Sequence, residues 1–213
     1  MPIVISVANA KGGVGKSTLA YCLGCYYAGR NAKVAILDED IQQTITDNIE
    51  VCTDRGEEVP LTLIKKSTLK SYTDLASRDE DIILVDTAPV ETTSIASIYD
   101  VSDMVLIPIK PSTNDYNSLQ RSLNTLREAM ERNPDMIVAI VINMAVKSST
   151  VQQAFRSAFE AEERIKVLNA ELANRVIHTK YILETYSLFN TSDKMAKQEM
   201  AAVGDEIYYL LTL

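Results

Sequence analysis

The chain has 213 residues, a formal net charge of −8 and a hydrophobic content of 46%. This length is enough to bury a full core, so we expect one domain spanning residues 1–213. The acidic balance argues against a surface coated with phosphate-binding cations, and three cysteines do not suggest a disulfide framework. No apolar run approaches the roughly twenty residues that cross a bilayer, and a predicted strand begins at once, so we expect a cytoplasmic protein without a signal peptide.

The first predicted element is a β-branched strand at residues 3–8, which leads into a glycine-rich loop at residues 8–18 and then into a helix. This order is typical of a phosphate cradle, because glycines let successive backbone N–H groups point at phosphate oxygens near the positive end of the helix dipole. Lys16 is placed to reach the β- and γ-phosphates of a nucleotide, and Ser17 to bind Mg²⁺. A glycine-rich turn without a ligand is the alternative.

The loop departs from the common pattern G-x-x-x-x-G-K-[ST], because Ala10 occupies the first glycine position. It matches K-G-G-x-G-K-[ST], with an additional lysine at Lys11, and so resembles the deviant Walker A P-loop of the ParA/MinD family of dimeric ATPases. The resemblance implies that Lys11 crosses to the nucleotide of a partner subunit and acts with Lys16 in catalysis. The residues expected to bind ATP in this loop are Gly12, Gly13, Val14, Gly15, Lys16, Ser17 and Thr18.

The helix after the loop is expected to end at Gly29, a common C-cap residue. It contains Cys22 and Cys25 in a C-x-x-C spacing. Since no second Cys or His pair completes a metal site, we interpret both as packing residues, and a metal or redox role is the alternative.

A second strand is predicted at residues 33–37, and Asp38 and Asp40 follow it at the edge where open parallel sheets bind ligands. Two carboxylates beside a triphosphate require Mg²⁺ or a water between the negative charges. We expect Asp38 to hold a water of the Mg²⁺ shell and Asp40 to orient or deprotonate the attacking water. This matches the family's D-x-D-P-Q pattern, except that Ile41 replaces the proline. The alternative is an acidic turn that caps a helix at residues 44–49.

The next segment carries the weakest signal, with an edge strand predicted at residues 61–64 and a short helix at residues 68–77. A buried strand then delivers Asp86 to the same sheet edge and resembles a Walker B strand, which implies that Asp86 binds Mg²⁺ through water. The metal site is therefore expected to comprise Ser17, Asp38 and Asp86. Residues 87–91 would form a second switch that senses the γ-phosphate. Helix capping is the alternative for Asp86.

A further buried strand is predicted at residues 104–108, ending at Pro108 because proline cannot donate to a ladder. Ser112 then begins a helix whose buried stripe is Leu119, Leu123, Leu126 and Met130. The region is similar to small plasmid-type ParA proteins, which implies that Lys110 and Asp115 contact the other subunit; a surface role is the alternative. The most apolar strand, residues 137–142, leads to Asn143, which the resemblance places beside adenine, with a turn or helix-cap role as the alternative.

The carboxyl-terminal third is locally basic, since residues 147–197 carry eight Lys and Arg against six Asp and Glu. In ParA-type proteins this part supplies a face that binds DNA without reading its sequence, which implies DNA contacts by Lys166, Arg175 and Lys180. For each the alternative is a solvated charge, and His178 is treated as a surface or internally satisfied histidine. The final helix, residues 191–213, ends in acids that an anionic membrane would repel, so we expect it to pack on the sheet and not to bind lipid.

Together these patterns predict a doubly wound, mainly parallel α/β sheet flanked by helices, of the P-loop NTPase type with a deviant Walker A loop. The resemblance implies a partition ATPase with ATP and Mg²⁺ as cofactors. It would form an ATP-dependent homodimer, bind non-specific DNA of the nucleoid and hydrolyse ATP slowly until a ParB-like centromere-binding protein stimulates it. The alternative is a MinD-like or protein-cluster-positioning ATPase.

Overall fold

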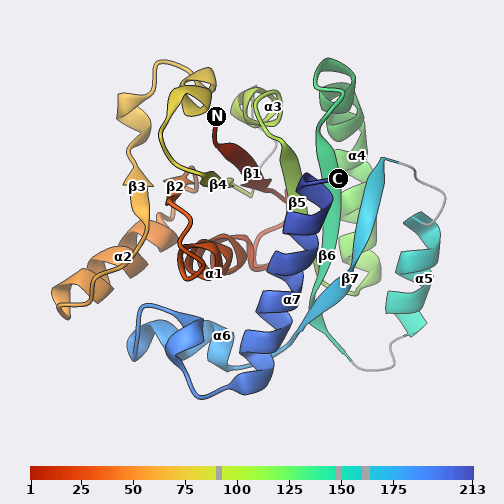
Figure 1. Ribbon diagram of the computed structural model, residues 1–213. Helices are drawn as coiled ribbons and strands as arrows, with labels where there is room; N and C mark the ends of the chain where they lie inside the picture. The colour runs from red at the N-terminus through yellow and green to blue at the C-terminus, as the bar shows by residue number, and fades with distance from the viewer. Residues whose placement is uncertain (90–92, 147–149, 160–163) are drawn as a thin grey trace.

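One seven-stranded parallel sheet organises the described part of the chain, which comprises residues 1–89, 93–146, 150–159 and 164–213 of a computed structural model (Figure 1). Its strand order is β3-β2-β4-β1-β5-β6-β7, with every neighbouring pair parallel. The strands are β1 (Ile3–Val7), β2 (Val34–Asp38), β3 (Thr62–Ile64), β4 (Ile82–Asp86), β5 (Met104–Ile109), β6 (Ile137–Ala145) and β7 (Ile165–Ala173). The predicted α/β class with a parallel sheet is confirmed.

Helices cover both faces of the sheet (Figure 1). Alternate strand residues point to opposite faces, so Ile5 and Val7 pack with helices on one side while Val4 packs on the other. The first side carries α1 (Lys16–Ala28), α2 (Thr44–Asp54) and α7 (Lys194–Leu211), and the second carries α3 (Thr93–Tyr99), α4 (Thr113–Arg132) and α5 (Thr150–Phe159). A short helix α6 (Ile177–Lys180) and two 3₁₀ turns join β7 to α7.

Most predicted elements lie where the sequence placed them. Gly29 is the C-cap of α1, Ser112 is the N-cap of α4, and the four residues of the predicted α4 stripe are buried. The helix predicted at residues 68–77 consists instead of two 3₁₀ turns, Lys66–Thr68 and Tyr72–Ser77. The predicted second switch falls partly on residues 90–92, which lie outside the described residues.

The prediction that Pro108 ends its strand is wrong, because β5 continues to Ile109 and Pro108 is paired with Val141 of β6. The backbone of Pro108 faces β1, where the C=O of Leu106 accepts from Ala8 and the C=O of Pro108 accepts from the side chain of Asn9 at 2.8 Å. Since β1 ends at Val7, no ladder donor is needed at this position.

The sequence pattern predicts no strand at residues 165–173, where the structure has β7 at one edge of the sheet. Its outer backbone is covered by side chains of α5 and α7. Glu206 accepts from the N–H groups of Asn169 and Ala170 at 2.8 Å each, and Arg156 donates to the C=O of Leu168 at 2.7 Å. These contacts occupy groups that would otherwise be free to pair with another strand. In the described part of the chain no helix is both long and apolar enough to cross a membrane.

Candidate functional site

The glycine-rich loop lies at the carboxyl end of β1 and requires glycine at two positions. Gly13 and Gly15 have φ angles of +71° and +90°, in the left-handed region that other residues rarely adopt. A Cβ on Gly15 would also lie 2.4 Å from Nδ2 of Asn143. Gly15 is the N-cap of α1, so the loop delivers the positive end of that helix to the centre of the sheet edge.

Two asparagines hold the loop in place. The side chain of Asn9 donates to Pro108 and accepts from the N–H of Lys11 at 2.9 Å. Nδ2 of Asn143, at the end of β6, donates to the C=O of Val14 at 2.8 Å, and its Oδ1 accepts from the N–H of the following residue at 2.9 Å. The sequence analysis does not predict the role of Asn9, although an asparagine at the start of such a loop is a signal for it. Asn143 lies beside the loop as predicted, and its contact with adenine stays a prediction.

Lys16 and Asp86 form the buried charged centre of this region. Lys16 is 5% exposed, and burial lowers the pKa of its amine, an effect that the carboxylates of Asp86 and Asp40 partly offset. Asp86 is fully buried, and neither of its oxygens has a hydrogen-bond partner among the described residues. Burial raises the pKa of Asp86 to about 7, and Ser17, which lies nearby without a hydrogen bond of normal geometry, offsets only part of this shift. A buried carboxyl without a partner is costly, and a cation or its water shell would satisfy it.

Asp38 and Asp86 are paired in register at the ends of β2 and β4, so the two acids lie side by side. Asp38 also caps α2, because its Oδ2 accepts from the N–H groups of Ile45 and Thr46 at 3.2 and 3.1 Å. Burial raises the pKa of Asp38, and these hydrogen bonds partly oppose the shift. The helix-capping alternative therefore describes Asp38, whose other oxygen accepts weakly from Asp40 at 3.3 Å. A role for Asp38 in the metal shell stays a prediction.

The loop after β2 carries the other predicted catalytic acid. Oδ1 of Asp40 accepts from the N–H of Gln42 at 3.0 Å, which gives the turn its shape. Ile41, which stands where the family pattern has proline, is 88% exposed. The carboxylate of Asp40 is near enough to influence Lys16, so the structure brings Asp40, Lys16 and Asp86 to one edge of the sheet.

Lys11 is paired within its own chain. Its Nζ lies 2.7 Å from Oδ2 of Asp115, whose side chain is 2% exposed, while that of Lys11 is 36% exposed. Asp115 is thus a buried group in the first turn of α4, which differs from the surface role considered for it. Lys110 is half-buried on the loop before α4.

A small cavity of about 50 Å³ lies beside the glycine loop on the β7 side, and Gly15, Asn143, Arg175, His178 and Thr179 are among its lining residues. Glu199 of α7 binds the guanidinium of Arg175 through two hydrogen bonds of 2.9 and 2.6 Å. Burial lowers the pKa of His178, and its Nε2 is buried without a hydrogen-bond partner in the described residues. Arg175, predicted to contact DNA, is therefore also a wall residue of the cavity beside the glycine loop.

The three predicted DNA contacts are not brought together. Lys166 is exposed near the amino end of β7, whereas Arg175 and the exposed Lys180 follow its carboxyl end. At about 3.3 Å per strand residue, the part of β7 from Lys166 to its end at Ala173 spans about 23 Å, so Lys166 and Arg175 lie at opposite ends of the strand.

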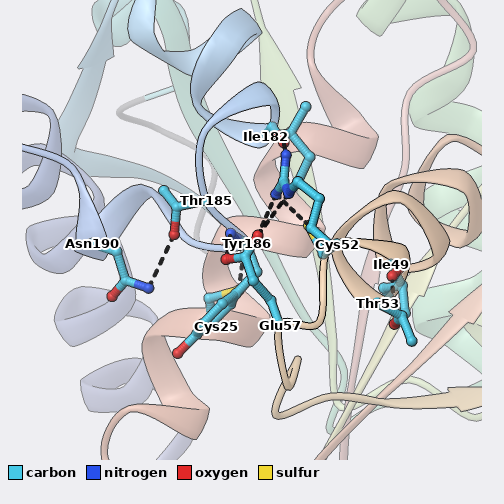
Figure 2. Close-up of polar contacts among 10 residues, drawn as sticks. Cys25, Ile49, Cys52, Thr53, Glu57, Ile182, Thr185, Tyr186 and Asn190 are labelled. Atoms are coloured by element: carbon cyan, nitrogen blue, oxygen red, sulfur yellow. Dashed lines mark hydrogen bonds and ion pairs between the residues drawn. The ribbon is translucent and has the colours of Figure 1, made fainter.

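The segment after α6 is tied to the end of α2 (Figure 2). Arg55 donates to the C=O of Ile182 at 2.6 Å, and Oε2 of Glu57 accepts from the N–H of Tyr186 at 2.8 Å. The hydrogen bond from Tyr186 is the main cause that lowers the pKa of Glu57. These contacts connect α2, the helix after Asp40, to the segment that follows α6. The polar residues at 55–57 do not indicate this connection in the sequence.

The cysteines of the chain are free and buried, as the packing interpretation requires. Burial is the main cause that raises the thiol pKa of each. Buried thiols with raised pKa values are poorly reactive, which fits a packing role. No group of three or more His, Cys, Asp and Glu side chains among the described residues could hold a metal ion.

The chain matches one family of nucleotide-binding domains and is similar to several known proteins. Residues 5–185 match the family model described as the CobQ/CobB/MinD/ParA nucleotide binding domain. The chain is similar to the maintenance of carboxysome distribution protein A of Halothiobacillus neapolitanus, with 24% identity over 97% of this chain and 94% of that protein. It is also similar to the protein ParA of Rhizobium radiobacter, with 24% identity over 98% and 94%. A plasmid partition protein of Borrelia burgdorferi B31 bound to AMPPNP has the same fold, with a TM-score of 0.76 and 21% identity over 98% of this chain and 99% of that one.

Proposed function

The chain belongs to the CobQ/CobB/MinD/ParA family of nucleotide-binding domains, and from this we propose that it is a ParA-type partition ATPase. Two copies would join around Mg·ATP, bind DNA without sequence preference and separate after slow hydrolysis. The observation that carries the proposal lies at the carboxyl edge of the sheet beneath the glycine loop. There the buried amine of Lys16 interacts electrostatically with Asp86, and neither carboxylate oxygen of Asp86 has a hydrogen-bond partner among the described residues. The protein would act in the cytoplasm, on the nucleoid.

The residues at this edge fit a magnesium nucleotide. Backbone N–H groups of residues 12–18 and the Lys16 amine would hold the phosphates. Ser17, Asp38 and Asp86 would hold Mg²⁺, directly or through its waters, and the ion when bound neutralises charge on the phosphates. Asp40 would orient the attacking water and accept its proton. Since this single carboxylate is the proposed activating group, we expect slow turnover until a ParB-like partner stimulates it.

Association with DNA would require the dimer. Lys11 would contact the nucleotide of the partner copy, and cations of both copies would then bind phosphates together. Lys166 and Lys180 are the more suitable of the proposed contacts because both are exposed, while Arg175 would have to share its guanidinium with Glu199. Binding through phosphates alone is weak and strongly dependent on salt.

The test is the affinity for random-sequence DNA with ATP, with ADP and without nucleotide, at two salt concentrations. We expect the parent to bind only with ATP, Lys11→Ala to lose this binding and Asp40→Ala to prolong it. Lys180→Ala should weaken binding and reduce the salt slope by about 2 per dimer, since each lost phosphate contact removes about 0.9. Lys33→Ala removes the same charge from an exposed residue near the start of β2 and should change neither quantity.

Equal affinity in all nucleotide states would overturn the partition proposal and leave the nucleotide site intact. A monomer that persists with bound Mg·ATP, in the absence of hydrolysis, would overturn the dimer cycle itself.

A second candidate is the positioning of a protein cluster, which the similarity to the Halothiobacillus protein favours. The two candidates share the nucleotide cycle and DNA binding, and they differ in cargo. Deletion of the gene would cause plasmid loss in the first case and uneven spacing of a protein assembly in the second. Counting both in dividing cells distinguishes them.

A further inference from the structure

The lysine that the dimer cycle needs is engaged inside the chain. Nζ of Lys11 lies 2.7 Å from Oδ2 of Asp115, and the two residues are 104 positions apart in the sequence. The backbone N–H of Lys11 is held by Asn9 at the same time, so both ends of the residue are fixed. The contact thus joins the glycine loop to the first turn of α4.

Asp115 is also held by contacts at the start of its own helix, α4. Its N–H donates to Oγ of Ser112 at 3.2 Å, and that hydroxyl also contacts Oδ2 of the carboxylate. The other oxygen, Oδ1, is buried and has no hydrogen-bond partner among the described residues. A pair serving only stability would be expected to satisfy both oxygens of a carboxylate that is 2% exposed. The Lys11 ammonium is therefore the cation that neutralises a poorly satisfied buried charge.

This arrangement conflicts with a contact between Lys11 and another copy. The carboxylate of Asp115 and the phosphates of a nucleotide are both anions, so a phosphate that approaches the ammonium also approaches Asp115. Resting on the proposed nucleotide-dependent dimer, we propose that Asp115 is a positioning residue that holds Lys11 on its own chain, and that each copy must release this contact before two copies join. The pair then sets how readily the dimer forms.

The size of the effect follows from the symmetry of the dimer. An ion pair with one exposed partner favours the closed arrangement by a factor of about 3 to 5 per chain. Since both copies must open, the dissociation constant of the dimer changes by the square of this factor, about 10- to 25-fold.

The experiment compares the parent with Asp115→Asn, which keeps the shape of the side chain and removes its charge. Dimer dissociation constants are measured by analytical ultracentrifugation with Mg·AMPPNP, which blocks hydrolysis. We expect Asp115→Asn to associate about 10- to 25-fold more tightly than the parent. Asp100→Asn is the matched control, because Asp100 is paired with Arg132 at 2.8 Å on the surface, and it should leave the dissociation constant unchanged.

A second measurement does not depend on dimerisation. Acetylation of lysines by an N-hydroxysuccinimide ester, followed by mass spectrometry of the nucleotide-free protein, reports how freely each amine is accessible. We expect Lys11 to react about 3 to 5 times faster in Asp115→Asn than in the parent, because the carboxylate no longer covers it, and Lys166 to react equally in both.

The outcomes separate this inference from the proposed function. Tighter association together with faster Lys11 acetylation supports the positioning role. A parent that dimerises with AMPPNP while Asp115→Asn associates equally or more weakly overturns the positioning role and leaves the proposed function standing. A parent that stays monomeric overturns both.

Discussion

Two groups of charged residues at the sheet differ in how many hydrogen bonds they receive from the rest of the described chain. At the carboxyl ends of β1 and β4, the amine of Lys16 is desolvated and both oxygens of Asp86 lack hydrogen bonds among the described residues. Along the outer edge of β7, Glu199 accepts from the N–H of Ala173 at 3.2 Å and binds Arg175 through two hydrogen bonds. Glu206 similarly accepts three hydrogen bonds from residues 169 and 170.

The difference fits the proposed function, in which the first group of charges holds a ligand while the second group stabilises the fold. Leaving a buried polar group unsatisfied lowers stability by about 1 to 3 kcal/mol, whereas a satisfied one contributes to it. The acids of α7 stabilise an edge strand, which fits the expectation that this helix packs on the sheet. The unsatisfied charges under the glycine loop lower the stability of the ligand-free protein, and a bound magnesium nucleotide would raise it by satisfying them.

The largest expected effect is the loss of nucleotide affinity when a charge of the first group is removed. Lys16→Ala should lower the affinity for Mg·ATP by more than about 100-fold, because a charge-assisted contact to phosphate is lost in a site shielded from water. Isothermal titration calorimetry measures the loss. Since burial already disfavours this amine in the free protein, the melting temperature should not fall. Lys33→Ala is the control and should bind as the parent does; a parent-like affinity in Lys16→Ala would show that the phosphates bind elsewhere.

Asp86→Asn should stabilise the nucleotide-free protein while it weakens Mg²⁺-dependent binding. The pKa of Asp86 is raised from 3.8 to about 7, so between these values the folded state holds a proton that the unfolded state has lost. Stability of the parent therefore falls as pH rises through this window and levels off above it. We expect the variant to be more stable by about 1 to 3 kcal/mol at about pH 8, and by less at about pH 5.

Chemical denaturation at the two pH values measures this difference. A variant that is less stable than the parent at about pH 8 would show that Asp86 is satisfied in the free protein and belongs with the second group.

The sequence predicted the first group well and the second poorly. Local patterns place Lys16 and Asp86 at one sheet edge, because a parallel sheet brings the ends of buried strands together. Strand β7 was missed because half-exposed and polar residues interrupt its apolar pattern, and its edge is completed by residues far along the chain. The pairing of Lys11 with Asp115 was likewise invisible, since it depends on a tertiary contact across 104 positions.

Glu199→Gln tests the second group and should destabilise the protein by about 1 to 2 kcal/mol, because it weakens hydrogen bonds from Arg175 and from the N–H of Ala173. Burial acts to raise the pKa of Glu199, but these contacts outweigh it and the net pKa is lowered. The stability it contributes is therefore present above its ordinary value of 4.5 and is lost as the pH falls through the lower folded value. The difference in melting temperature between parent and variant should be largest near about pH 7 and shrink below about pH 4.

The exposed Glu184 supplies the control, since Glu184→Gln makes the same chemical change on the segment before α7 and should leave the melting temperature unchanged. An equal loss in both variants would mean that net charge, and not the contact with β7, governs the effect.

The smallest effect concerns Arg175, which lies where the two groups meet. Its guanidinium binds Glu199 and its side chain lines the cavity beside Gly15. If Arg175 serves the fold, Arg175→Ala should lower stability by about 1 kcal/mol and weaken DNA binding less than Lys180→Ala does. Melting temperatures and DNA affinities of the two variants, measured together, decide between the assignments. A larger loss of DNA binding in Arg175→Ala, with unchanged stability, would place Arg175 among the charges kept for a ligand, because only a guanidinium released from Glu199 can reach a phosphate.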